Sequence, residues 1–541
     1  MSVRRVMGIE TEYGVLEPGN PRANPIALST FVVGAYAQVS HHSPRIRWDY
    51  NDEDPLCDAR GFRLDRASAH PSMLTDGEAP DSMRPRDSEG LVPPSPADDR
   101  PPVTKRARPA ERRDTGPANV ILSNGARLYV DHAHPEYSSP EVTSPLDAVL
   151  WDRAGEEIML AASRTLAATD QLPDVALYKN NVDGKGASYG THENYLLDRA
   201  VPFGDVVRCL TPFLVTRPVV CGAGRVGIGP AGERGGFQVS QRADYIEAEV
   251  GLETTLRRPI VNTRDEPHAD STRYRRLHLI TGDANLLEVS TYLKMGTTSL
   301  LLWLLERGDV PAKLDALQLA DPVGEVHAVS RDLRLTHRLA LADGRALSAI
   351  DVQRVYLDVL ARAVAESGEA DAQTLDVLGR WGSVLDRLAA DPMTCAADVE
   401  WVAKLRVLEA MRSRDHLGWD SARLAALDLQ WSDVRPERGV YARLAAKGAV
   451  ERLVAPAAVA AAVTDPPADT RAYFRGECVR RYGGDVAAVN WDSVVFDLPG
   501  QEALLRVPML EPTRASRAHV GDLLERSRDA AALVEALTSG R

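Results

Sequence analysis

Several short segments of this 541-residue chain alternate polar and apolar side chains, and the polar ones are of types that bind metal ions or catalyse reactions. Successive side chains of a β-strand point to opposite faces of the sheet, so residues two apart share a face. The residues that share a face in this way are Glu10 with Glu12, Arg127 with Tyr129 and Asp131, His192 with Asn194, and Arg276 with His278. We therefore expect four strands that each present reactive groups on one side.

These residue types indicate a metal-bound phosphate chain as the ligand. Oxygen ligands suit Mg²⁺, and imidazole nitrogen can join them. Arginine pairs with phosphate oxygens. One alternating strand alone is more often the solvated face of an antiparallel sheet. Four strands with this set of types predict instead that, if the strands are neighbours, one sheet face forms a polar cradle for a nucleotide held through magnesium.

Two glycine-rich segments resemble nucleotide-binding loops but lack the required context. Residues 222–227 match the dinucleotide fingerprint G-x-G-x-x-G, which must be followed by a helix. The sequence continues as IGPAG, which cannot form one. Residues 183–186, DGKG, lack the spacing of a phosphate-binding P-loop. We expect neither segment to bind a nucleotide in these known ways.

The segment Asp131-His132-Ala133-His134 resembles the strand-end His-x-His of zinc-dependent amidohydrolases. That fold needs eight alternating βα units. This chain instead places its strands first and its helices later, which is typical of the α+β class. We expect His132 and His134 to lie on the face opposite Tyr129 and Asp131 and to be structural.

The elements that would position these residues follow from caps and composition. A helix is predicted to begin at Asn24-Pro25, with Leu28, Phe31, Val32, Ala35 and Val39 on its buried face. A second is predicted after Ser144, with Asp147 completing a capping pattern.

Residues 66–118 are rich in Pro, Asp, Arg and Ser and predict a long disordered insertion, either functional or passive. We expect residues 296–450 to be mainly helical, and a break at Asp465-Pro466-Pro467 divides a large domain, 1–464, from a small C-terminal domain, 469–541.

Composition restricts the cell compartment and the kinds of partner. The net charge of −13 argues against a general nucleic-acid binder, which would show a basic face. Five scattered cysteines without CxxC spacing are typical of free thiols in a reducing compartment. The apolar runs are too short to span a bilayer, and the N-terminus does not resemble a secretion signal. We expect a cytoplasmic enzyme without membrane or nucleic-acid partners.

Longer motifs surround these strands and run in order through most of the chain. They are MGIETEYG at 7–14, ANPI at 23–26, RWDY at 47–50, NGARLYVDHAHPEYSSPE at 124–141, YKNNVDGKGASYGTHENY at 178–195, GRVGIGP at 224–230, VNTRDEPHAD at 261–270, YRRLHLITGDANLLEVSTYLK at 274–294 and LDLQWSDVRPERGVY at 427–441. As a set they resemble the Pup ligase and Pup deamidase family. Two features resemble the deamidase branch, namely the VDHAHPEY form of the central motif and the long insertion before it.

The resemblance implies a fold and an activity. The fold would be the glutamine-synthetase-like (carboxylate–amine ligase) α+β fold, with a curved antiparallel sheet cradle backed by helices, plus a small C-terminal domain. The partners would be Pup, a small disordered protein, and pupylated proteins. The activity would be ATP- and Mg²⁺-dependent hydrolysis that converts the C-terminal glutamine of Pup to glutamate and cleaves Pup–lysine isopeptide bonds. ATP would be required without being consumed in proportion to product.

The resemblance also implies roles for individual residues. Asp131 would be the catalytic carboxylate, acting either as a nucleophile or as a general base toward water. The magnesium ligands would be Glu10, Tyr129, Glu136, His192 and His278. The nucleotide contacts would be Glu12, Ser138, Ser139, Asn194 and Arg276.

Two other functions stay open at this point. One is the Pup–protein ligase, which would use ATP stoichiometrically to activate a carboxylate. The other is a non-catalytic Pup-binding adaptor of the same fold. No expected ligand position carries an apolar residue, which argues against the adaptor.

Overall fold

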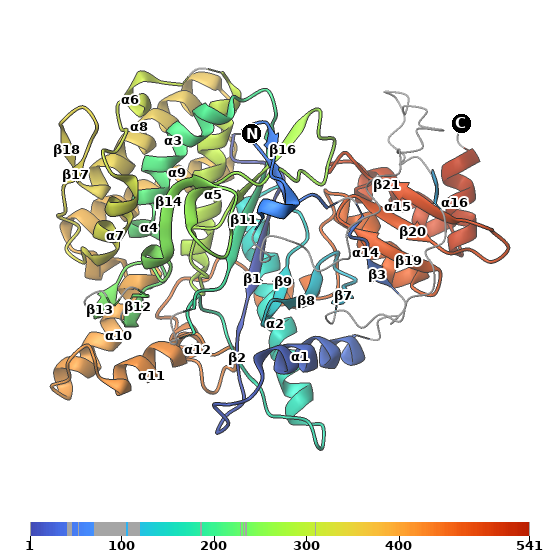
Figure 1. Ribbon diagram of the computed structural model, residues 1–541, viewed down its shortest axis with the longest axis horizontal. Helices are drawn as coiled ribbons and strands as arrows, with labels where there is room; N and C mark the ends of the chain where they lie inside the picture. The colour runs from blue at the N-terminus through green and yellow to red at the C-terminus, as the bar shows by residue number, and fades with distance from the viewer. Residues whose placement is uncertain are drawn as a thin grey trace.

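A computed structural model describes residues 2–40, 46–51, 53–69, 104–106, 119–183, 187–227, 229, 230, 232, 235–308 and 310–539. Figure 1 shows a central sheet with helices around it and a separate group of strands and helices at the C-terminal end of the chain. No helix in the described part of the chain is long and apolar enough to cross a membrane.

The central sheet has six strands in the order β16-β11-β1-β9-β8-β7. Their bounds are Met7–Glu12 for β1, Asn119–Ile121 for β7, Arg127–Asp131 for β8, His134–Ser138 for β9, Thr191–Asp198 for β11 and Tyr274–Leu279 for β16. Every neighbouring pair is antiparallel. The four strands predicted to carry reactive groups are therefore all members of one sheet.

One face of this sheet is apolar and packs on helices. Met7 and Ile9 of β1 belong to the same buried core as Leu277 and Leu279 of β16, and Leu128 and Val130 of β8 belong to a second core. Glu193, also on this face, is neutralised by two 2.7 Å contacts from Arg217. The alternation of faces predicted from the sequence is confirmed.

The helices of the large part of the chain cover that apolar face and extend from it (Figure 1). Helix α1 packs on α2, β8 and β9, while α5 packs on α2 and β11. Their bounds are α1 Pro25–Val39, α2 Pro145–Ala167, α3 Phe203–Thr216, α4 Pro218–Cys221, α5 Glu288–Glu306, α6 Ala312–Asp315, α7 Pro322–Arg331, α8 Ala349–Ser367, α9 Ala372–Ala390, α10 Glu400–Arg414, α11 Ala422–Trp431, α12 Val440–Ala446 and α13 Pro456–Ala462. The predicted α+β class, with an antiparallel sheet backed by helices, is confirmed.

Short strand pairs complete this part of the molecule. They are β2 Gly14–Leu16 with β10 Ala176–Tyr178, β4 Cys57–Asp58 with β5 Phe62–Arg63, β12 Arg225–Gly227 with β13 Gly236–Gln238, β14 Ile246–Gly251 with β15 Arg258–Asn262, and β17 Leu339–Ala340 with β18 Ala346–Leu347. Strand β12 follows Gly224, and none of the described residues between Arg225 and Gln238 is helical, so the described part of this segment lacks the helix that the dinucleotide fingerprint requires.

Both predicted helix starts are confirmed, but the predicted face of α1 is partly wrong. Asn24 accepts hydrogen bonds from the N–H groups of Ile26 and Ala27, and Ser144 accepts one from Asp147. Phe31 and Val39 are exposed, whereas Val33 and Tyr36, which were not predicted, are buried. Helix α1 is apolar nearly all round, so its periodicity could not select the face that packs against α2 and the sheet.

The C-terminal part has a second sheet and a second core, to which Ile121 of β7 also belongs. It contains α14 Ala472–Tyr482, β19 Val486–Asn490, β20 Ser493–Phe496, β21 Leu504–Pro508, α15 Arg517–Arg526 and α16 Ala530–Ser539. Its sheet, in the order β3-β19-β20-β21-β6, takes β3 Arg47–Trp48 and β6 Thr104–Arg106 from the N-terminal half of the sequence. The domain division at 464 and 469 stays a prediction, and the C-terminal sheet includes strands from both sides of it.

The long insertion predicted at 66–118 is described only in part. Residues 66–68 form a single 3₁₀ turn and residues 104–106 form β6, paired with β21. Residues 70–103 and 107–118 lie outside the described residues, so the predicted disorder stays a prediction there.

Candidate active site

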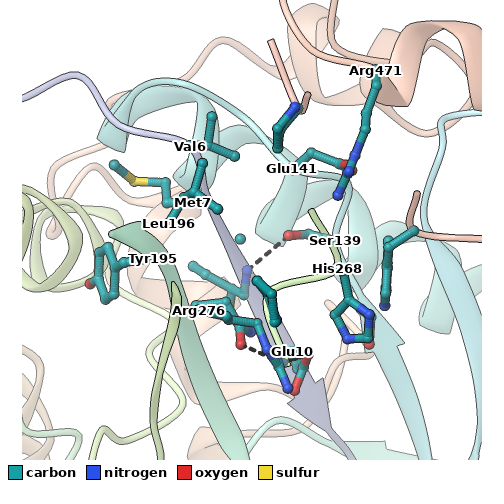
Figure 2. Close-up of a pocket in the computed structure, with 17 residues that line it drawn as sticks. Val6, Met7, Glu10, Ser139, Glu141, Tyr195, Leu196, His268, Arg276 and Arg471 are labelled. Carbon is teal, nitrogen blue, oxygen red and sulfur yellow. Dashed lines mark hydrogen bonds and ion pairs between the residues drawn. The ribbon is translucent and has the colours of Figure 1, made fainter. Parts of the chain in front are cut away.

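A pocket opens on the polar face of the central sheet, where the sheet meets the C-terminal part (Figure 2). Its empty volume is about 550 Å³, including the part open to solvent. Five predicted site residues line it: Glu10, Ser138, Ser139, Asn194 and Arg276. The hydroxyl of Ser139 is already engaged, because it accepts a 2.9 Å hydrogen bond from the N–H of Ile9.

The other polar and aromatic residues that line this pocket were not predicted from the sequence. They are Glu141, Tyr195, His268, Arg471 and Trp491. Arg471 and Trp491 come from the C-terminal part, more than 300 residues along the chain from β1. No period-two pattern marks them, so only the tertiary fold brings them to this site.

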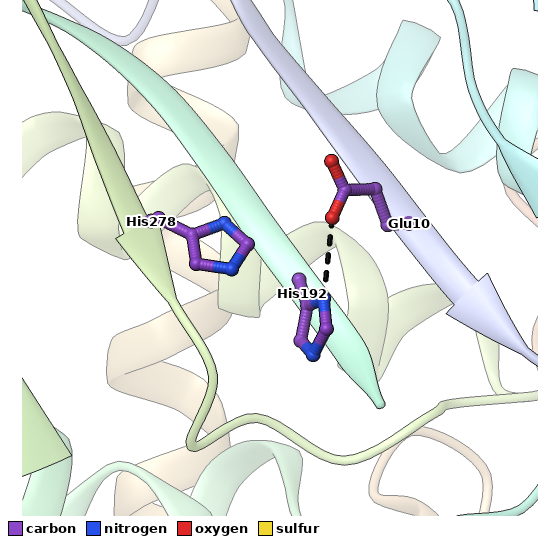
Figure 3. A group of neighbouring side chains, drawn as sticks. All are labelled: Glu10, His192 and His278. Carbon is purple, nitrogen blue, oxygen red and sulfur yellow. Dashed lines mark hydrogen bonds and ion pairs between the residues drawn. The ribbon is translucent and has the colours of Figure 1, made fainter. Parts of the chain in front are cut away.

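Three predicted metal ligands converge next to the pocket. Glu10 of β1 lies directly opposite His192 of β11, and His278 lies on the next strand, β16. One potential ligand atom from each lies within 4.8 Å of the others. Figure 3 shows the three side chains reaching toward one another from adjacent strands, with His192 Nδ1 3.2 Å from Glu10 Oε2.

Asn194 and Arg276 fix the orientation of His278. The carbonyl Oδ1 of Asn194 accepts a 2.8 Å hydrogen bond from Arg276 Nη1, and His278 Nδ1 lies 2.9 Å from the same oxygen. Because this oxygen can only accept, Nδ1 carries the proton and Nε2 keeps its lone pair. That tautomer is the one a metal-binding histidine needs when a carbonyl holds its other nitrogen.

A second acidic group lies beside the first. Glu12, Asp131 and Glu136 each place an oxygen within 4.8 Å of the others. Glu12 and Tyr129 both lie directly opposite Glu136 on its two neighbouring strands. The Tyr129 hydroxyl donates a 2.6 Å hydrogen bond to Glu136 Oε1, and Ser138 donates to the same oxygen at 3.2 Å. Glu12, predicted as a nucleotide contact, thus belongs to this acidic group, and its role stays a prediction.

The prediction that His134 lies on the opposite face from Asp131 is wrong. A tight turn through His132, whose φ is +50°, makes Asp131 and His134 direct partners across β8 and β9. Direct cross-strand partners share a face. His134 Nδ1 lies 3.1 Å from Glu12 Oε2, and its ring stacks on Tyr189 at 4.2 Å. Counting residues along the sequence failed because the chain reverses direction between the two positions.

The electrostatics of the two groups favour a bound cation. Burial and the charges of Asp131, Glu10 and Glu12 hold the pKa of Glu136 well above its usual range. Burial and Glu136 also raise the pKa of Tyr129. The pKa of Glu10 is lowered despite its burial, because His192 hydrogen-bonds it and Arg276 is nearby. Four carboxyl groups so close together, with imidazole on one side, are a donor set that fits magnesium.

Arg242 is a buried cation that the sequence analysis missed. Its side chain is 1 % exposed, and Nη1 makes one long hydrogen bond, 3.3 Å, to the carbonyl of Thr191. Its Nε has no hydrogen-bond partner among the described residues. Burial and the charge of Arg258 lower its pKa to about 9, while Glu12 raises it. A buried, poorly paired guanidinium beside Glu12 is costly for folding, which is typical of a functional group.

Comparisons with known proteins agree with this geometry. A family model described as Pup-ligase protein matches residues 5–495. A depupylase of Acidothermus cellulolyticus is 53% identical over 542 residues, which cover 100% of both chains. A Pup deamidase/depupylase of Mycobacterium tuberculosis strain H37Rv is 53% identical over 540 residues, covering 99% of each chain.

Two solved structures share the fold. A complex between Pup and its ligase PafA aligns with a TM-score of 0.74 and 29% identity over 97% of this chain and 91% of that one. The Pup ligase PafA in complex with ADP aligns with a TM-score of 0.68 and 33% identity over 76% of this chain and 90% of that one.

Proposed function

The chain belongs to the Pup-ligase protein family, and we propose that it is a Pup deamidase and depupylase. It hydrolyses the side-chain amide of the C-terminal glutamine of Pup and the isopeptide bond between Pup and a target lysine. The full-length relatives named for these activities are 53% identical to it, whereas a relative named Pup–protein ligase is 41% identical over 67% of it. Its partners are therefore Pup and pupylated proteins.

The observation that carries this proposal is the position of Asp131. Its side chain is 34% exposed, whereas Glu136 beside it is buried, so a substrate amide can reach Asp131. Burial acts to raise the pKa of Asp131, but hydrogen bonding and charge from His132 outweigh it and lower the pKa. Asp131 is therefore ionised at neutral pH. An ionised carboxylate can attack the amide carbonyl directly or take a proton from water, and both routes stay open.

We assign the metal and nucleotide to the surrounding residues. Glu10, His192 and His278 would hold one magnesium ion, and Glu136 with Tyr129 would add oxygen ligands beside it. When bound, magnesium supplies positive charge that stabilises negative charge developing near it. Ser138, Ser139, Asn194 and Arg276 would line the bound ATP, with the C-terminal part closing the pocket.

Arg242 supports a hydrolytic centre at this position. A fixed cation that is already desolvated stabilises developing negative charge more strongly than one that must shed water. Its positive charge, which acts on Glu12, would favour the negative charge that develops when the amide carbonyl is attacked.

Mass spectrometry of glutamine-ended Pup tests the proposal. Incubation with the chain, Mg²⁺ and ATP should give glutamate-ended Pup and ammonia, with far less ADP than ammonia. Pup joined to a lysine substrate should be released in the same mixture. Omitting nucleotide should stop both reactions.

Two other outcomes would contradict it. ADP that accumulates one for one with a Pup–lysine conjugate, with glutamine-ended Pup left intact, would indicate the ligase. Nucleotide and Pup binding without any turnover would indicate an adaptor.

A further inference from the structure

Asp283 is a buried carboxylate between β16 and α5, and it belongs to neither acidic group of the active site. Its two oxygens accept four hydrogen bonds. Oδ2 accepts from the N–H groups of Ala223 and Gln241 at 2.8 and 3.0 Å, and Oδ1 accepts from the hydroxyl of Ser240 and the N–H of Arg242 at 2.9 and 3.2 Å. Three of the four donors are consecutive residues, so Asp283 fixes the backbone segment that carries Arg242.

The loop that carries Asp283 is itself held by α5. The backbone carbonyl of Asp283 accepts a 2.7 Å hydrogen bond from Nζ of the buried Lys294, and Oδ1 of Asn285 accepts a 3.0 Å bond from the same Nζ. A Cβ at the preceding residue, Gly282, would clash with the carboxylate of Glu193, so the chain passes close against β11 here. The loop is therefore a fixed support for whatever Asp283 binds.

The segment 240–242 reaches the active site through the side chain of Arg242. Its Nη1 donates a 3.3 Å hydrogen bond to the carbonyl of Thr191, the residue before the predicted metal ligand His192. One long hydrogen bond restrains a guanidinium weakly. The place of this charge in the site therefore depends on how firmly the backbone of residue 242 is held, and Asp283 is what holds it.

Asp283 also acts on Arg242 through its charge. Burial and the charge of Arg258 lower the pKa of Arg242 to about 9, while Glu12 and Asp283 act to raise it. A cation contributes most to a reaction when it is already oriented and needs no rearrangement as charge develops. Asp283 supplies both conditions, because it fixes the backbone of Arg242 and favours its charged form.

We propose that Asp283 is a positioning residue for amide hydrolysis, which holds Arg242 where its charge favours the negative charge developing on the attacked amide. This inference rests on the proposed function, because it takes Arg242 to act on a substrate amide. Asp283 lies behind the segment 240–242 and works through it.

A double-mutant cycle on kcat for deamidation of glutamine-ended Pup tests this role. Asparagine keeps one acceptor oxygen but replaces the other with an NH₂ group, which cannot accept a hydrogen bond. Asp283→Asn should therefore lower kcat by about ten- to hundredfold, as a displaced group does, and leave the affinity for ADP with Mg²⁺ within a few-fold. In the Arg242→Met background the same change should lower kcat by no more than about twofold, because the charge to be positioned is gone.

Ser240→Ala separates the hydrogen bonds from the charge of Asp283. The Ser240 hydroxyl donates to Asp283 and accepts a 3.1 Å hydrogen bond from the N–H of Arg242. Alanine loses both contacts and leaves every charge in place. Its kcat should fall in the same direction as that of Asp283→Asn, and again only when Arg242 is present. This milder variant decides the question if Asp283→Asn does not fold.

Glu400→Gln and Ser290→Ala are the matched controls. Glu400 is as buried as Asp283 and also accepts four hydrogen bonds, but from residues 285–287 and Trp431. The buried hydroxyl of Ser290 likewise donates one hydrogen bond and accepts another, both with backbone groups. Each control should lower the melting temperature about as much as its counterpart and keep the wild-type kcat.

Equal losses of kcat in the wild-type and Arg242→Met backgrounds would overturn the inference, since Asp283 would then act independently of Arg242. A lower melting temperature with wild-type kcat in Asp283→Asn and Ser240→Ala would overturn it in favour of a purely structural role. A wild-type chain that hydrolyses no glutamine-ended Pup would overturn the proposed function as well. An active wild type together with wild-type kcat in Arg242→Met would overturn this inference alone.

Discussion

The hydroxyl of Tyr129 donates a 2.6 Å hydrogen bond to Glu136 directly across the pair of strands β8 and β9. The acceptor is a buried carboxyl group, and its burial together with the charges of Asp131, Glu10 and Glu12 raises its pKa. The hairpin therefore holds together groups that repel one another as long as they are ionised. A bound cation would remove that repulsion.

Glu136→Gln should abolish most of the stabilisation by magnesium and leave the metal-free protein as stable as before. Glutamine keeps the size and the acceptor for Tyr129 but removes the anionic oxygen that a hard cation prefers. A ligand that binds only the folded state raises the melting temperature, so thermal unfolding with and without Mg²⁺ and ADP measures the effect. Glu157→Gln, an exposed change on α2, is the control. An unchanged metal-induced shift in Glu136→Gln would exclude Glu136 as a ligand.

Asp131→Asn should lower kcat for deamidation by about 10²–10⁴-fold, the usual contribution of a proton-transfer or nucleophilic group. Nucleotide affinity should stay within a few-fold, because the residues that line the pocket are unchanged. Quantifying ammonia release and ADP binding on the same preparation separates the two effects. Glu247→Gln, an exposed change on β14, should alter neither. Amide hydrolysis at the wild-type rate would refute the role of Asp131.

Arg242→Met should lower kcat by about a hundredfold, as the loss of one preorganised electrostatic contribution does, without loss of stability. Stability should not fall, because the buried charge of Arg242, which is 1 % exposed, is compensated by only one 3.3 Å hydrogen bond, so that its burial costs the folded state free energy. Arg217→Met is the matched comparison, because Arg217 is equally buried but makes two 2.7 Å contacts with Glu193. Its loss should cost about 3–5 kcal/mol of stability by leaving Glu193 buried and unpaired. Urea unfolding and steady-state rates of both variants decide the question. Equal destabilisation by the two changes would show that Arg242 is a structural residue.

The alternation of polar and apolar residues predicted the faces of the central strands, because side chains of a strand alternate between its two faces and here one face is buried. Glu10, His192 and His278 could therefore be placed on one face before the order of the strands was known. The same reasoning failed for His134, because the turn at His132 changes which positions share a face. It also failed for α1, where Phe31 and Val33 are equally apolar and only packing decides which is buried.

Contacts distant in sequence explain what the motifs could not predict. Trp491 and Arg471 line the pocket because the C-terminal part docks against the end of β9, and no local spacing records that docking. No sequence motif marks Arg242, because what distinguishes it is that its buried guanidinium is poorly paired in the folded protein. These residues could be assigned to the site only from the tertiary structure, whereas the strand faces could be predicted from the sequence.

Glu141 holds the C-terminal part against the sheet through two arginines. Glu141, three residues after β9, accepts a 2.7 Å contact from Arg471 and also pairs with Arg475. Arg475 in turn donates to the carbonyl of Trp491 at 2.8 Å. This carboxylate therefore connects the sheet to a wall of the pocket. Burial alone would raise the pKa of Glu141, but Arg475 and Arg471 outweigh it and lower the pKa to about 2.

A carboxyl group whose pKa falls on folding stabilises the folded state above its unfolded pKa, about 4.5, and loses that contribution as the pH falls toward 2. Glu141→Gln should therefore be less stable than the wild type by about 3 kcal/mol at pH 7. The difference between the two proteins should begin to shrink below about pH 4.5 and disappear below about pH 2, where the wild-type carboxylate becomes protonated in the folded state as well. Urea unfolding of both proteins at a series of pH values measures this difference. Glu511→Gln, whose partner Arg273 is 60% exposed, should change stability by less than about 1 kcal/mol at every pH. If the difference between Glu141→Gln and the wild type stayed constant from pH 7 to the acid limit, the ion pairs of Glu141 would not be what holds the C-terminal part in place.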